Sequence, residues 1–134
     1  MKYLGLDYGK ARVGIALGTD DTNVAVGKGI LEGLTQNKLI VKIKAIVNLE
    51  KIDRIIVGLP LNMQSQPTEM TEEVKLFIEK LRSHLQIPVQ AIDERFTSQM
   101  ADNLLQDVKG EKKQDQVAAQ LILQTYLDQQ SQLK

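Results

Sequence analysis

Two short apolar runs near the N-terminus, Tyr3–Tyr8 and Val13–Leu17, flank a tight turn of glycine and basic residues. This pattern predicts a β-hairpin. Because side chains alternate across a strand, Asp7 shares its face of the first run with small residues, and the second run also has a small face. The small residues of the two faces are Gly5, Gly9, Gly14 and Ala16. If the faces coincide, Asp7 looks over a hollow that a ligand or a metal could fill; otherwise Asp7 is a turn residue that hydrogen-bonds its own backbone.

After this hairpin, apolar periodicity and turn residues predict a third strand and then alternating helices and strands, in the order β-β-β-α-β-α-β-α-α. This order is typical of an α/β domain with a five-stranded mixed sheet, an antiparallel meander followed by β-α-β units, and helices on both faces. Strand Ile52–Val57 should run parallel to Tyr3–Tyr8. The other expected elements are strands Val24–Leu34 and Pro88–Ile92, and helices that start near Thr35 or Asn37, at Thr71, at Thr97 or Ser98, and near Gln114.

Composition bounds the class of protein. The 134 residues contain no repeat and no linker, so we expect a single domain over residues 1–134. Cysteine is absent, which excludes a disulfide framework and a thiolate zinc site. The 17 basic and 17 acidic residues cancel, so net charge indicates no partner. No membrane segment or signal peptide is evident, and we expect a soluble cytoplasmic protein.

Three acidic positions stand where an α/β protein binds ligands. Asp7 and the pair Asp93–Glu94 each end a predicted strand, and ligands of such sheets bind beyond the carboxyl ends of strands. Asp115 opens the last helix on its apolar side, so it should point at the sheet. Carboxylates brought together repel one another unless a cation neutralises them. Mg²⁺ or Mn²⁺ is the natural occupant, and such a metal suits phosphoryl transfer.

Each of these acids also has a simpler interpretation. Asp115 could serve only to complement the dipole of its helix. The run Asp93-Glu94-Arg95 could be a surface ion-pair cluster, and such clusters contribute little to stability. The metal hypothesis rests on the three acids meeting, with their carboxylates within roughly 4–8 Å of one another. In the absence of metal, their repulsion is uncompensated and they can separate.

Four motifs, spread in order over nearly the whole chain, resemble those of the YqgF family, whose members are described as pre-16S rRNA nucleases and as Holliday-junction resolvases. The first, Leu4–Gly9 with Arg12–Ala16, would be weak evidence alone, but the four together are specific. The other three motifs are Ile56–Met63, Asp93–Ser98 and Asp115–Leu127.

The resemblance implies a ribonuclease-H-like fold and a metal-dependent nuclease that hydrolyses phosphodiester bonds, with a role in 5′-end processing of pre-16S rRNA during ribosome biogenesis. Nucleic acid would be the partner and Mg²⁺ or Mn²⁺ the cofactor. The family's acidic positions, both catalytic and metal-binding, correspond to Asp7, Glu94 and Asp115; if Asp115 pointed away from the sheet, Asp93 would replace it. The residues expected to contact substrate phosphates are Lys10, Arg12 and Arg95.

Two departures from the family pattern affect the expected substrate. The loop after the Asn-Met pair reads Gln64–Pro67, where the family usually has an acidic residue and a glycine, and the loop before Asp115 is short. Branched DNA is therefore the alternative substrate. Two other classes of protein stay open. One is an actin-like ATPase, because Gly5–Gly9 resembles the first phosphate loop of that superfamily, although such enzymes need two domains. The other is a nucleic-acid-binding module without catalysis.

Overall fold

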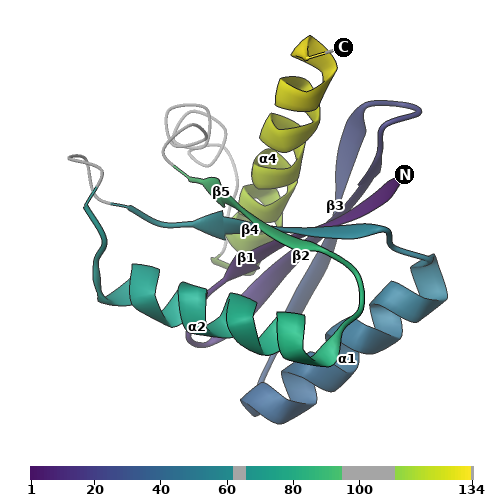
Figure 1. The fold of residues 1–134 in the computed structure, drawn as a ribbon. Coiled ribbons are helices and arrows are strands. Elements are labelled where there is room, and N and C mark those ends of the chain that lie inside the picture. Colours follow the sequence, from purple (N-terminus) through teal and green to yellow (C-terminus); the bar gives the residue numbers. More distant parts are fainter. Residues whose placement is uncertain (62–65, 95–110, 134) are drawn as a thin grey trace.

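The computed structural model describes residues 1–61, 66–94 and 111–133, with side chains from residue 114 onward in the last stretch. Figure 1 shows a single twisted sheet with helices against both of its faces. The strands are β1 (Lys2–Tyr8), β2 (Arg12–Thr19), β3 (Val24–Glu32), β4 (Arg54–Leu59) and β5 (Val89–Asp93). The described helices are α1 (Gln36–Glu50), α2 (Glu69–His84) and α4 (Glu111–Gln132).

The strand order is β3-β2-β1-β4-β5. The first three strands pair antiparallel, whereas β4 pairs parallel with β1 and β5 pairs parallel with β4. This confirms the predicted five-stranded mixed sheet with a meander followed by parallel strands. The predicted helix that starts at Thr97 or Ser98 lies outside the described residues.

Several strand and helix boundaries differ from the predicted ones by two or three residues, and the structure shows the cause of two of these differences. The fourth strand begins at Arg54 rather than Ile52, because Lys51 ends α1 in the left-handed conformation, with φ of 55°, and the chain needs two residues to reach the sheet. Helix α2 begins before the expected Thr71, because Thr68 is its N-cap and bonds reciprocally with Thr71.

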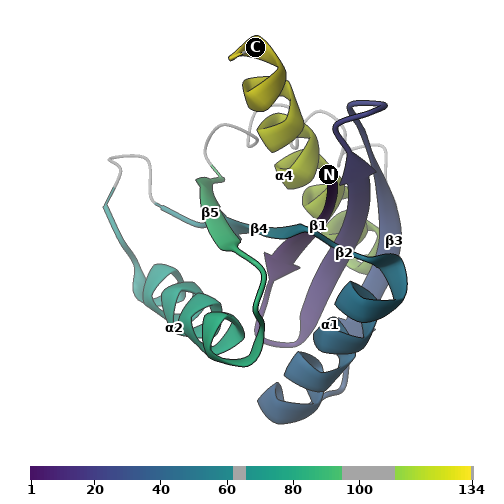
Figure 2. The same cartoon turned by 45° about the vertical axis from the view of Figure 1, so that its right-hand side comes forward.

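Helices α1 and α2 lie side by side on one face of the sheet, and α4 covers the other (Figures 1 and 2). The first face is built from large aliphatic side chains, which form one core with α1 and α2 around Phe77. The second face carries small residues and forms a separate core with the apolar side of α4. Among the described helices none is long and apolar enough to cross a membrane.

The small faces of β1 and β2 coincide as predicted, since Asp7 pairs with Gly14 and Gly5 pairs with Ala16. The prediction of a hollow above these small faces was wrong, because α4 fills the space. A Cβ atom on Gly5 would lie 2.8 Å from Leu123 Cβ. The small residues therefore admit a helix at close range, and they leave Asp7 half-buried beside the first turns of that helix.

Candidate active site

The parallel arrangement of β1, β4 and β5 brings their carboxyl ends to one edge of the sheet. Asp7 is the penultimate residue of β1, and Glu94 directly follows β5. The backbone N–H of Glu94 donates to the carbonyl of Leu59 at 3.1 Å, which extends the β4–β5 ladder by one bond and fixes the start of the Glu94 side chain. Asp7 and Glu94, separated by 87 residues of sequence, therefore approach each other across the end of β4.

The side chains of Asp7 and Glu94 are hydrogen-bonded to each other. Two carboxyl groups can form such a bond only when one of them carries a proton, so the pair shares a proton. The pKa of Glu94 is raised to about 8, mainly by burial and to a lesser extent by the charge and hydrogen bond of Asp7 and by the charge of Asp93. Burial also raises the pKa of Asp7, against the lowering effect of the bond from Glu94.

Asp115 lies on the sheet-facing side of α4. Its negative charge raises the pKa of Asp7, so it is near the carboxyl pair. Its Oδ2 atom accepts a hydrogen bond of 2.7 Å from Nε of Arg12 at the start of β2. Both side chains are partly exposed, at 25% for Arg12 and 30% for Asp115. The ion pair joins the first hairpin to α4 beside the pair Asp7–Glu94.

Among residues 1–61, 66–94 and 114–133, no three acidic or histidine side chains form a group compact enough to hold a metal ion. Asp7 and Glu94 are in contact, whereas Asp115 is bound to Arg12. The three-carboxylate site therefore stays a prediction, and it requires the side chain of Asp115 to turn from Arg12 toward the pair. Glu94, not Asp93, is the acid of its motif that contacts Asp7.

Gly58, near the end of β4, leaves room for the side chain of Glu94. A Cβ atom at position 58 would lie 2.6 Å from Glu94 Oε1 and 2.5 Å from Ile122 Cδ1. Gly58 falls within the second of the four motifs, but its role could not be predicted from the sequence. Only the approach of a distant glutamate and of α4 explains why position 58 lacks a side chain.

Of the three residues expected to bind phosphate, the structure describes Lys10 and Arg12. Lys10 is 74% exposed in the β1–β2 turn, with Nζ 3.5 Å from Glu73 Oε1, and Arg12 binds Asp115. Arg95 and the first half of the loop Gln64–Pro67 lie outside the described residues. Beside Lys10 and Arg12, the β1–β2 turn and the β3–α1 connection enclose a cavity of about 200 Å³.

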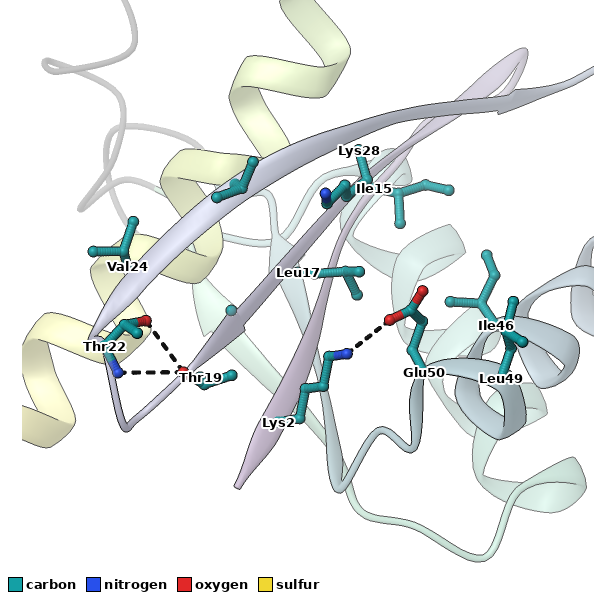
Figure 3. A pocket seen from close by; sticks show the side chains of 12 residues that line it. Lys2, Ile15, Leu17, Thr19, Thr22, Val24, Lys28, Ile46, Leu49 and Glu50 are labelled. Carbon is teal, nitrogen blue, oxygen red and sulfur yellow. Dashed lines mark hydrogen bonds and ion pairs between the residues drawn. The ribbon is translucent and has the colours of Figure 1, made fainter.

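A larger groove, of about 500 Å³, lies toward the opposite end of the sheet, between β2, β3 and the end of α1 (Figure 3). Its charged lining residues include Lys2 and Glu50, whose side chains are joined at 2.7 Å. The rest of the lining is largely apolar, with exposed Val24 and Leu49. Because its one acidic residue is neutralised by Lys2, this groove is a poor candidate for metal chemistry.

Known proteins are similar to this chain in sequence and in fold. The family model described as RuvX, Holliday junction resolvase, matches residues 1–129. The chain belongs to the RuvX family. A RuvX relative of Natranaerobius thermophilus, named “Putative pre-16S rRNA nuclease”, is 35% identical over 97% of this chain and 96% of its own. A relative of the same name from Endomicrobium trichonymphae is 38% identical over 97% of both chains. The resemblance to the YqgF family is confirmed, because RuvX and YqgF denote one family of nucleases.

Solved structures confirm the RuvX fold. RuvC of T. thermophilus in complex with a Holliday junction substrate superposes with a TM-score of 0.65 and 11% identity, over 98% of this chain and 96% of that one. The yeast mitochondrial Holliday junction resolvase Ydc2 superposes with a TM-score of 0.63 and 11% identity, over 98% of this chain and 79% of its own. The predicted ribonuclease-H-like fold is therefore correct.

Proposed function

We propose that this protein is a metal-dependent nuclease that hydrolyses phosphodiester bonds in the 5′-end processing of pre-16S rRNA. The observation that carries the proposal is the contact of the Asp7 and Glu94 carboxyl groups at the carboxyl edge of the parallel strands, with Asp115 beside them. The names of the relatives supply the substrate. Processing of ribosomal RNA would place the protein in the cytoplasm.

The donor set fits a hard divalent cation such as Mg²⁺ or Mn²⁺. Such ions take oxygen ligands, and Asp7, Glu94 and Asp115 would provide them. The contact between Asp7 and Glu94 supports this assignment, because a cation bound there would remove the repulsion between two half-buried carboxylates. When bound, the metal activates the attacking water and stabilises the leaving oxygen.

The remaining residues of the site position these carboxylates and the substrate. Arg12 holds Asp115 near the pair, and its guanidinium can turn to a substrate phosphate in exchange. Lys10 extends into solvent beside it and adds a second cation for the phosphate backbone. Arg95 follows Glu94 in sequence, and we assign it the same role. Gly58 keeps the space in which Glu94 sits.

Branched DNA is the second candidate substrate, favoured by the superposition of 98% of the chain on RuvC bound to a Holliday junction substrate. The two candidates are separated by incubating the purified protein with a pre-16S rRNA fragment that spans the mature 5′ end and, separately, with a four-way DNA junction. Each reaction is run with Mg²⁺ or Mn²⁺ and, as a control, with EDTA. We expect metal-dependent cleavage of the RNA; cleavage of the junction alone would make the protein a resolvase.

A further inference from the structure

We propose that the cavity beside the candidate active site binds one unpaired nucleobase, next to the phosphate that is cleaved. The cavity lies between the β1–β2 turn and the β3–α1 connection, at the end of β1 that carries Asp7. Its aliphatic lining belongs to the face of the sheet that packs on α1 and α2, whereas Asp7 faces α4, and Arg12 reaches from the cavity to Asp115 on that second face. This inference rests on the proposed nuclease function and extends it, because it specifies which feature of a nucleic acid the protein recognises.

The size of the cavity suits a single ring system. Its volume is about 200 Å³, which is below the roughly 300–1,000 Å³ typical of pockets for drug-sized ligands. It opens into a shallower groove of about 560 Å³. The two hollows share five lining residues, Lys10, Ala11, Arg12, Glu32 and Leu34. A partly enclosed pocket that adjoins a more open groove fits a base attached to an extended chain.

The walls of the cavity offer both apolar contact and a rigid aromatic ring. The ring of Tyr8 is stacked on Phe77 with centroids 4.2 Å apart and an interplanar angle of 23°, so its position is fixed before any ligand arrives. Apolar and aromatic side chains hold unpaired bases by stacking and burial. The aliphatic lining residues are Val13, Leu31, Leu34 and Leu39.

Polar groups at one side of the cavity match the edge of a base. Gln36 Nε2 donates to the hydroxyl of Tyr8 at 3.4 Å, and Gln36 Oε1 accepts from Lys80 Nζ at 3.1 Å. The bond of 3.4 Å is long for an N–H···O contact, so exchanging it for a bond to a ligand costs little. An amide and a hydroxyl together present donors and acceptors, as the edge of a nucleobase does.

Arg12 connects this cavity to the carboxylates. It lines the cavity, and its Nε atom donates to Asp115 at 2.7 Å. A nucleotide whose base fills the cavity would therefore have its phosphate beside Arg12 and Lys10, with the acidic Glu32 on the same rim. Because the base must be unpaired to enter, cleavage should occur next to a single-stranded or splayed nucleotide and not within continuous duplex.

The test measures binding of the RNA or junction fragment that the wild type cleaves, in EDTA, by fluorescence anisotropy. A series of fragments lacks one base each at successive positions around the cleaved bond. The test variant combines Tyr8→Phe, which keeps the stacking on Phe77, with Gln36→Leu. The matched control is Asn37→Leu, an exposed neighbour of Gln36 that does not line the cavity.

For the wild type and the control, we expect that loss of the base at one position weakens binding about tenfold. The double variant keeps the aromatic ring but loses the polar contacts, so it should bind the intact fragment more weakly and should lose less than the wild type when that base is removed. Equal losses at every position, or the same loss in the double variant, would overturn the proposal. A wild type that cleaves neither substrate would overturn the nuclease function together with it, whereas cleavage without a base effect would overturn the cavity assignment alone.

Discussion

At the scale of single residues, the shared proton of Asp7 and Glu94 is the feature with the most direct consequence. In the folded protein, burial and the charge of Asp7 raise the pKa of Glu94 from about 4.5 to about 8. The folded state therefore binds more protons than the unfolded state over this range of pH. By linkage, the free energy of unfolding decreases as pH rises from about 4.5 to about 8 in metal-free buffer.

The Glu94→Gln variant tests this linkage. The glutamine keeps a hydrogen bond to Asp7 but no longer titrates, so the melting temperature of the variant should decline less between pH 5 and pH 8, as measured by thermal denaturation in EDTA. Asp93→Asn is the control, because it removes a neighbouring charge and keeps the titrating carboxyl of Glu94. Equal declines in wild type and Glu94→Gln would contradict the assignment of the proton to this pair.

At the scale of elements, the glycine-rich face of the sheet determines where α4 lies. A Cβ atom on Gly14 would lie 2.1 Å from the backbone carbonyl oxygen of Asp115, so Gly14→Ala should push the start of α4 away from the sheet. We expect a stability loss of about 1–3 kcal/mol, as for other overpacked sites, and a larger fall in cleavage, because Asp115 moves with the helix. Denaturant unfolding and cleavage rates measure the two effects.

The matched control for Gly14→Ala is Ile15→Val, on the opposite face of β2. It removes one methyl group from the core around α1 and α2, at a cost of about 0.5–1.5 kcal/mol, and does not touch α4. If the loss of cleavage activity followed the loss of stability equally in both variants, the position of α4 would have no separate effect on the site, and the prediction would be wrong.

The contacts of α4 also mark the limit of what sequence alone predicts. Alternation along β1 and β2 correctly placed Asp7 on the small face, because the period of a strand is local information. What covers that face depends on residues such as Leu123, over 100 positions away. Separation in sequence also concealed the ion pair of Arg12 with Asp115, and the contacts of Gly58 with Glu94 and Ile122. The resemblance identified three acids but not which two share a proton.

At the scale of the whole molecule, the site depends on strand order. Placing β4 between β1 and β5 brings Asp7 and Glu94 to the same edge, and the return of the chain in α4 adds Asp115. A site assembled from both ends of the chain should respond to metal as a unit. Mg²⁺ that binds only the folded protein should stabilise the whole domain. The free energy of unfolding should then increase with the logarithm of the Mg²⁺ concentration once this concentration exceeds the dissociation constant.

The most direct test of the central claim is a comparison of wild type with Asp7→Asn in cleavage of the pre-16S rRNA fragment and of the four-way junction. The substitution keeps the shape of the side chain and removes its charge. We expect cleavage to fall by orders of magnitude, while the melting temperature in EDTA is unchanged or slightly higher and rises less on addition of Mg²⁺ than in the wild type. Equal cleavage by the two proteins, with equal stabilisation by Mg²⁺, would contradict a catalytic role for Asp7.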